Sequence, residues 1–414
     1  MTDTVELEPA ATMRSSPRAT VLTTMTCWLT AIVLAICACH PAAGPTGPRP
    51  DARGQALDRQ VPGLLRDYHV AGAGVAILEH GAVVWTGYYG EQGPGVPATA
   101  RTVFNTASVA KTMTAETLIA LAAKGLISLD EPISRYVRDP ELSSDPRFAK
   151  LTCRLLLSHR GGLLNWPYEY EDGHAAFIAE PGTKFSYSGM GVELAARYAE
   201  AKLGKDFEVL AFEHVLALLG ITEMALGRIK PWMTGRLATP MDASGAYFTI
   251  AASTGRLAAG DNGWSAADDL LTTVDAYARF LAGVIRSDHL APAWIAERTR
   301  ILASLEGDPI WNCVPGPDLT CATHYGHALG WMVYQFDHKT VVKHGGNDKG
   351  ENALVIYSPD TGNGAAIFIN GGNGAPVSTQ ILALINDQPE IAAYYRQLVK
   401  KFYNVALPVL PAAR

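Results

Sequence analysis

The sequence predicts an α/β fold in which an antiparallel sheet of at least five strands is flanked by helices and carries a mostly helical insert. Three observations predict it. A hairpin pattern of apolar, valine-containing runs lies near the N-terminal end, further strand patterns lie near the C-terminal end, and residues 105–320 between them carry helical periodicity. A cleft is expected where the sheet and the helical insert meet.

The strands are expected in two groups, one from each end of the chain. Ala71–Leu78 and Ala82–Tyr89 form the early hairpin, joined by Glu79-His80-Gly81. Turn-forming residues connect the strands of a later meander, which comprises Ala328–Phe336, Lys339–His344, Asn352–Tyr357 and Gly364–Asn370.

Helical periodicity marks several segments of the middle of the chain, among them Ser188–Leu203 and Ala266–Val284. In Phe104–Leu121 apolar side chains recur every three or four residues. Gly125 stands just past that run, where a left-handed helix cap is favoured. The stretch from Ser378 onward is apolar enough to close over the sheet.

Composition limits the class of protein. The 414 residues are 48% hydrophobic and 18% charged, which is ample for one large domain or two interleaved ones. The net charge is −6, and no run of Lys and Arg is long enough to follow a phosphate backbone. No nucleic-acid partner is therefore expected.

Residues 1–39 are predicted to be an export signal, because two arginines precede the apolar run Val21–Ile36. That run is shorter than the about 20 residues that span a bilayer. Ile36-Cys37-Ala38-Cys39 is similar to a bacterial lipobox, so Cys39 is the predicted lipidation site. The alternatives are a cleaved soluble signal and an uncleaved membrane anchor.

The rest of the chain divides into a flexible Pro- and Gly-rich linker at 40–54, a folded domain at 55–390 and a C-terminal tail at 391–414. A lipid on Cys39 would anchor the domain to a membrane on the periplasmic side of a bacterial cell envelope.

Three cysteines remain outside the signal. In an oxidising compartment Cys313 and Cys321 can form a disulfide, whereas Cys153 lies in an apolar helical pattern and is expected to be a buried free thiol. Cys321, His324 and His327 do not follow a usual zinc spacing. A disulfide with surface histidines is favoured, and neither a metal nor another cofactor is expected.

Ser108 and Lys111 form a Ser-x-x-Lys pair in the first turn of the helix predicted from Phe104. Side chains three residues apart share one helix face, close enough for the amine to take the hydroxyl proton. The pattern is short and is expected by chance roughly once in a chain of this length. Alone it fits an ordinary helix equally well.

Two further segments bear on this pair. The run EPGTKFSYSG at 180–189 places Tyr187 at the start of a predicted helix, and KHGGN at 343–347 ends a predicted strand with His344 and two glycines. Glycines there allow a ligand to approach the backbone closely. By themselves, Tyr187 would be a packing residue and His344 a strand-end histidine.

In this order the segments resemble the serine β-lactamase and penicillin-binding protein superfamily, on the side of class C β-lactamases and family VIII esterases. Its three motifs match at 108–111, at Tyr187 and at 344–346, and the resemblance covers roughly residues 55–385. Supporting runs are AGAGVAILEHGAVVWTGYYG, LLSHRGGL and YGHALGW. The resemblance implies a β-lactamase/transpeptidase-like fold.

The resemblance also implies catalytic roles. Ser108 would be the nucleophile that forms an acyl-enzyme, and Lys111 and Tyr187 would share the role of base. Tyr187 would also activate the deacylating water, and His344 would orient Tyr187 or the substrate.

Substrate binding is implied for the strand end. The backbone N–H groups of Ser108 and Asn347 would form the oxyanion hole, with Gly345 and Gly346 between His344 and Asn347 lining the substrate site.

One departure from the family pattern bears on the substrate. The second motif has Gly189 where asparagine is usual, and glycine lacks the amide that binds the acyl-amide oxygen of β-lactams and peptides. His344 likewise stands where lysine is common. Both differences favour ester cleavage, although Ser188 or Asn165 could compensate.

The favoured function is a cell-envelope serine hydrolase acting on esters or small amides. One alternative is a true β-lactamase or D-alanyl-D-alanine carboxypeptidase, with a β-lactam or a peptidoglycan-derived substrate. Another is a binding protein that keeps the fold without turnover. Loops around Trp166, Tyr168 and Trp311 are expected to select the substrate.

Overall fold

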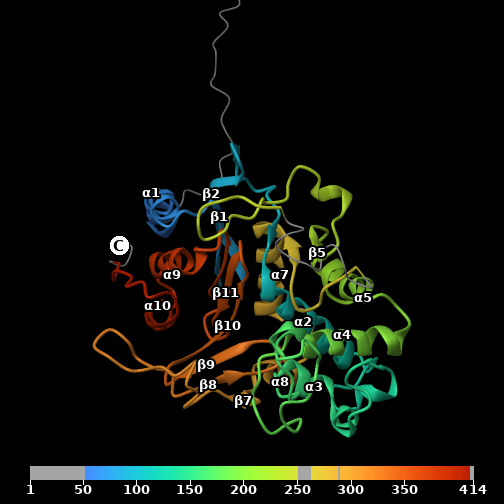
Figure 1. The fold of residues 1–414 in the computed structure, drawn as a ribbon. Coiled ribbons are helices and arrows are strands. Elements are labelled where there is room, and N and C mark those ends of the chain that lie inside the picture. The colour runs from blue at the N-terminus through green and yellow to red at the C-terminus, as the bar shows by residue number, and fades with distance from the viewer. Residues whose placement is uncertain (1–51, 250–262, 288–289, 411–414) are drawn as a thin grey trace, which may run out of the picture. The chain divides into compact units, whose positions relative to one another are not determined.

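A nine-stranded antiparallel sheet forms the centre of the structure, a computed structural model that describes residues 52–249, 263–287 and 290–410 (Figure 1). The strand order is β3-β2-β1-β12-β11-β10-β9-β8-β7. The strands are β1 Gly72–Glu79, β2 Ala82–Gly93, β3 Val96–Pro97, β7 Ala303–Ser304, β8 His324–His327, β9 Met332–Phe336, β10 Lys339–Asn347, β11 Asn352–Tyr357 and β12 Gly364–Asn370.

The two ends of the described chain meet in this sheet, as the sequence predicts. Strand β1 pairs with β12, so that Gly72 lies opposite Asn370. The central strands β1, β11 and β12 are buried almost throughout. They are continuous apolar runs because helices cover both faces of the sheet.

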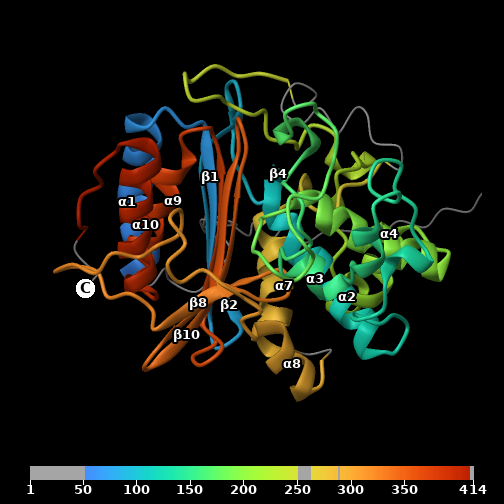
Figure 2. The same ribbon diagram turned by 60° about the horizontal axis from the view of Figure 1, so that its bottom comes forward.

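One face of the sheet is covered by α1 (Ala52–Asp67), α9 (Gly374–Ile385) and α10 (Pro389–Tyr403) (Figure 2). The other face packs against α7 (Val274–Arg286), beyond which lies the helical part of the fold. This arrangement gives two large hydrophobic cores, one on each side of the sheet.

The helical part surrounds α2 (Ala110–Ala123), whose residues are buried from Ala110 to Ala122. Its other helices are α3 Cys153–Leu157, α4 Gly189–Leu203, α5 Phe207–Ala211 and α8 Pro292–Thr299. A small sheet consists of β4 Phe104–Asn105, β6 Leu270–Thr272 and β5 Met224–Leu226. Short helical turns are Ala107–Val109, Ile133–Arg135, Pro146–Lys150, Pro167–Glu169, Phe212–Leu216, Ala217–Leu219 and Pro231–Met233.

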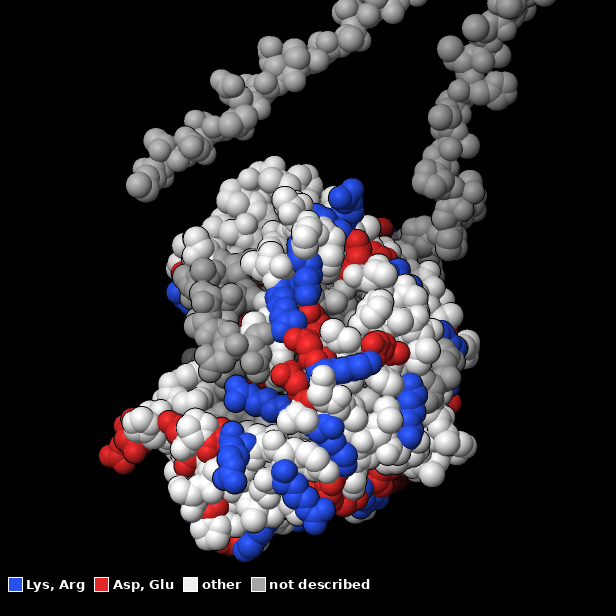
Figure 3. Space-filling model, turned by 90° about the vertical axis from the view of Figure 1, so that its right-hand side faces the viewer, with Lys and Arg blue, Asp and Glu red and all other residues white. Residues whose placement is uncertain are grey.

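Acidic and basic side chains alternate over the surface of the helical part that Figure 3 shows. Ion pairs within the helical part include that of 2.6 Å between Arg228 and Asp206. The charges on this face therefore neutralise one another locally.

Two sequence predictions about the elements need correction. The strand expected at Ala328–Phe336 begins only at Met332, because Gly330 adopts a positive φ of 72° in the turn between β8 and β9. The helix expected at Ala266–Val284 begins at Val274, after strand β6, where Thr273 caps it by accepting the Ala276 N–H.

The predicted domain limits were also too narrow. Helix α1 begins at Ala52, inside the predicted linker 40–54, and α10 occupies much of the predicted tail 391–414. Ile391 and Leu398 of α10 are buried in the core beside the sheet. The folded domain therefore extends through α10.

The cysteine predictions are confirmed, since Cys313 and Cys321 form a disulfide and Cys153 is a buried free thiol. The predicted signal and Cys39 lie outside the described residues. Within the described ranges, no helix is long and apolar enough to cross a bilayer.

If α10 belongs to the domain, Ile391→Ala should lower the free energy of unfolding by about 2–5 kcal/mol, because it leaves a cavity in the core. Lys400→Ala, on the exposed side of the same helix, should change it by less than about 0.5 kcal/mol. Urea denaturation measures both. Equal, small effects would mean that α10 is an appendage.

Candidate active site

Ser108 lies in the tight turn between β4 and α2, just before the helix in which the sequence places it. The preceding Ala107 has a φ of 46°, which is unusual for a residue other than glycine. Asn105 supports this turn, because its Oδ1 accepts the Ala107 N–H at 3.0 Å and its Nδ2 donates to Asp269 at 2.9 Å. The turn is thus held by buried side chains.

Lys111 is the partner of Ser108. Its side chain is fully buried, and its Nζ lies 2.9 Å from Ser108 Oγ and 2.6 Å from the Ala267 carbonyl oxygen. The rings of Tyr187 and Trp166 lie 4.9 Å and 5.7 Å from the same nitrogen. The amine is therefore fixed against the serine hydroxyl in a buried position.

Tyr187 is half-buried and lies directly before Ser188, the N-cap of α4. The cap forms because Ser188 Oγ accepts the Gly191 N–H at 3.0 Å. The structure thus brings Ser108, Lys111 and Tyr187 together, as the sequence predicts.

His344 is buried on β10, with its ring centre 6.4 Å from that of Tyr187. Its Nδ1 lies 2.7 Å from the Gly345 carbonyl oxygen, which can only accept, so Nδ1 carries the proton. Its buried Nε2 is left with a free lone pair. Burial lowers the pKa of His344 well below its usual value, so the ring is neutral.

Two histidines that the sequence analysis did not assign to the site pack around Tyr187. The ring of His159 lies 4.4 Å from that of Tyr187, and His159 Nδ1 accepts the Ser188 N–H at 3.0 Å. His327, expected on the surface, is buried 4.8 Å from His159, and burial lowers its pKa to about 3. The sequence could have indicated both residues, because His159 lies in LLSHRGGL and His327 in YGHALGW, two of the runs that support the family resemblance.

Strand β10 lies directly against the turn that carries Ser108. A Cβ atom at Gly346 would lie 2.2 Å from the Thr106 carbonyl oxygen and 3.2 Å from the Ser108 nitrogen. A Cβ atom at Gly345 would meet nothing closer than 3.7 Å. Only glycine at 346 lets the strand reach the serine backbone.

Gly189, where the family usually has asparagine, faces the ring of Trp166. A Cβ atom there would lie 2.2 Å from this ring, so the indole fills the space of a side chain at 189. The Gly189 N–H donates to Asn165 Oδ1 at 2.7 Å. This contact turns the amide of Asn165 toward the site.

A single cavity of about 310 Å³ is lined by Ser108, Asn165, Tyr187, His344 and Asn347. Of the three aromatic residues expected to select the substrate, Trp311 lines this cavity. Trp166 lies behind Gly189, and Tyr168 is exposed.

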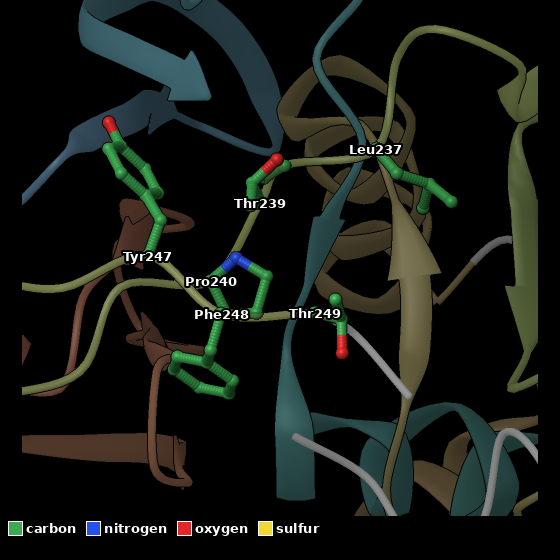
Figure 4. A pocket seen from close by; sticks show the side chains of 7 residues that line it. Leu237, Thr239, Pro240, Tyr247, Phe248 and Thr249 are labelled. Atoms are coloured by element: carbon green, nitrogen blue, oxygen red, sulfur yellow. The ribbon is translucent and has the colours of Figure 1, made fainter. Parts of the chain in front are cut away.

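A second hollow is lined by Leu237, Thr239, Pro240, Tyr247, Phe248 and Thr249 (Figure 4). The described residues that line it carry no charged side chain. Nor do the described residues include a group of three or more histidine, cysteine or acidic side chains that could hold a metal ion.

Comparison with known proteins identifies the family of this chain. The family model described as Beta-lactamase matches residues 57–388. The chain belongs to the Beta-lactamase family. It is a serine hydrolase of that family.

The relatives differ in the functions that their names state. Penicillin-binding protein 4 of Amycolatopsis lactamdurans is 25% identical over 83% of this chain and 89% of its own length. A β-lactamase of Pseudomonas fluorescens is 31% identical over 40% of this chain, so the match spans about half (49%) of that relative. Esterase EstB of Burkholderia gladioli is 32% identical over 27% of this chain and 30% of its own length.

Solved structures confirm the β-lactamase/transpeptidase-like fold. The octameric penicillin-binding protein homologue from Pyrococcus abyssi has a TM-score of 0.65 at 20% identity and covers 84% of this chain and 81% of its own. A class C β-lactamase mutant has a TM-score of 0.62 at 17% identity, and the match covers 80% of this chain and 97% of the mutant.

The close approach of β10 to Ser108 predicts unequal effects at two adjacent glycines. Gly346→Ala should lower kcat/KM by about 10² or more, because the strand and the serine turn must separate and move the oxyanion-hole donors. Gly345→Ala should cost less than about tenfold, since its Cβ meets only ordinary contacts. Ester hydrolysis by both variants, with circular dichroism as the folding control, measures this. Equal losses in the two variants would contradict the role given to the close contact between Gly346 and the Ser108 turn.

Proposed function

We propose that this protein hydrolyses esters or small amides through an acyl-enzyme on Ser108. The observation that carries the proposal is the contact of 2.9 Å between Ser108 Oγ and the buried Lys111 Nζ, inside the cavity that Tyr187 also lines. A nucleophile and a base in hydrogen-bond contact are the arrangement that covalent catalysis requires.

In the proposed acylation step, the amine of Lys111 takes the proton of Ser108 as the serine oxygen attacks the substrate carbonyl carbon. The carbonyl electron pair moves onto its oxygen, which the N–H groups of Ser108 and Asn347 stabilise. Collapse of this intermediate breaks the bond to the leaving alcohol, which takes a proton from Tyr187, and Lys111 returns a proton to Tyr187. Both residues then regain their starting states.

In the proposed deacylation step, a water molecule attacks the acyl-enzyme and gives a proton to Tyr187, which passes its own proton to Lys111. Collapse of the intermediate releases the acid, and Ser108 takes its proton back from Lys111. The neutral rings of His159 and His344 beside Tyr187 add no positive charge to this site.

The Trp166 ring supports a preference for esters. It occupies the space at Gly189 from which an asparagine would bind an amide oxygen. Asn165 is the observation that favours the second candidate, a β-lactamase or D-alanyl-D-alanine carboxypeptidase, because its amide lines the same cavity. A binding protein without turnover is disfavoured, because the nucleophile and its base are both present and in contact.

The ester preference predicts that kcat/KM for p-nitrophenyl acetate exceeds that for benzylpenicillin by about 10² or more, the usual effect of one missing oxyanion or amide donor. Initial rates under one set of conditions give both values, and Ser108→Ala should abolish both. Faster penicillin hydrolysis would support the second candidate instead. Turnover that survives in Ser108→Ala would overturn the proposal.

We also propose export to a bacterial cell envelope with lipid attachment at Cys39, on the strength of the signal pattern alone. Radiolabelled palmitate should be incorporated into the full chain in cells and should be lost in Cys39→Ala. Labelling that is absent from the wild-type chain would exclude the lipid anchor.

A further inference from the structure

The cavity at Ser108 continues away from the serine toward α10. The β9–β10 ladder ends at the pair Lys343–Met332, so the edge of β10 beyond this pair is not covered by β9. From there the same cavity is lined by Trp311, Met332, Leu398, Val399 and Phe402. We name this part of the cavity, with Lys343 and Tyr395 at its polar end, the α10 arm.

The walls of the α10 arm lie largely outside the family match, which ends at residue 388, one residue before α10 begins. The loop that carries Trp311 is fixed to this helix, since Tyr394 Oη donates to the Trp311 carbonyl oxygen at 2.6 Å and Gln397 Nε2 to that of Asn312 at 3.1 Å. Hydrogen bonds within this chain therefore hold the walls of the arm in place.

The lining of the α10 arm is apolar and aromatic. Leu398 and Val399 are buried, while Phe402 is 50% exposed and stands with its ring 6.3 Å from that of Trp311. Lys343 Nζ lies 2.8 Å from Tyr395 Oη and within 6 Å of the rings of Trp311, Tyr334 and Tyr395. Such a lining suits an alkyl or aryl group.

The arm opens on the Tyr187 side of the cavity. His327, which packs near Tyr187 with ring centres 6.1 Å apart, pairs with Met332, a residue of the arm. A leaving group that takes its proton from Tyr187 must lie on this side. The group that reaches the arm is then the alcohol part of an ester.

We infer that the α10 arm binds the alkyl or aryl group of the leaving alcohol and makes this enzyme selective for esters of bulky, apolar alcohols. The inference rests on the proposed function and names its substrate class. Each methylene group of the alcohol that is buried in the α10 arm should raise kcat/KM about threefold to fourfold.

The charge on Lys343 adds a pH dependence to this selectivity. Burial lowers the pKa of Lys343 to about 7, so the amine is charged below this pH and neutral above it. The groups that face Lys343 do not change their protonation near pH 7. Burial raises the pKa of Tyr334 and of Tyr395, and it lowers the pKa of His327 to about 3. An apolar group beside a buried charge is disfavoured, so the selectivity should increase from pH 6 to pH 8.

The test compares ethyl, butyl, hexyl and 2-phenylethyl acetate, which all leave the same acetyl-enzyme. We expect kcat/KM for hexyl acetate to exceed that for ethyl acetate by about tenfold or more at pH 8. Phe402→Ala should lower this hexyl-to-ethyl ratio at least about threefold, and Lys400→Ala, on the same helix but outside the arm, should leave it unchanged. Lys343→Met should remove the pH dependence of the ratio.

The outcomes separate the two proposals. A ratio near one, or a high ratio that Phe402→Ala does not change, would overturn the arm while leaving the hydrolase in place. Absence of any acetate hydrolysis would overturn the proposed function. In that case, calorimetric binding of 1-hexanol that Phe402→Ala weakens would still uphold the arm, and no binding would overturn it.

Discussion

The structure depends on holding the buried Lys111 amine against Ser108. A buried amine is costly unless it is hydrogen-bonded, and here the Ala267 carbonyl oxygen and Ser108 Oγ supply its partners. Helix α2 can place it there because the helix itself is buried on every side. The segment that carries Ala267 is fixed in turn, because Glu193 on α4 accepts the N–H groups of Ala266 and Ala267. The helical part of the fold thus serves to position one nitrogen atom.

The sheet contributes the other half of the site through one close contact. At Gly346 the backbone of β10 approaches the Ser108 turn closely enough to exclude a side chain. Because β10 pairs with β11 as far as Asn347, its end remains part of the sheet. The proposed catalysis at Ser108 therefore requires the sheet and the helical part to keep a fixed distance. The proposed oxyanion hole spans this contact.

The sequence predicts the structural features that local patterns encode. It does not predict features that depend on contacts between distant segments of the chain. The spacing of Ser108 and Lys111, the hairpin and the late meander follow from periodicity, and the structure contains them. Strand β6 was missed because Leu270–Thr272 is a short apolar run whose pairing with β4 and β5 overrides its helical pattern. The filling of the Gly189 site by Trp166 could not be read from sequence, because the two residues meet only after folding. His327 was placed on the surface for the same reason, since its burial depends on His159 and Phe185.

The central claim is that Ser108 is a nucleophile activated by Lys111. The most direct test is the rate and position of covalent labelling by a fluorophosphonate, followed by intact mass and by peptide mapping. The account predicts one adduct, on Ser108, and a labelling rate that falls by about 10²–10⁴ in Lys111→Met, the usual worth of a general base. Labelling at another residue, or an equal rate in Lys111→Met, would contradict it.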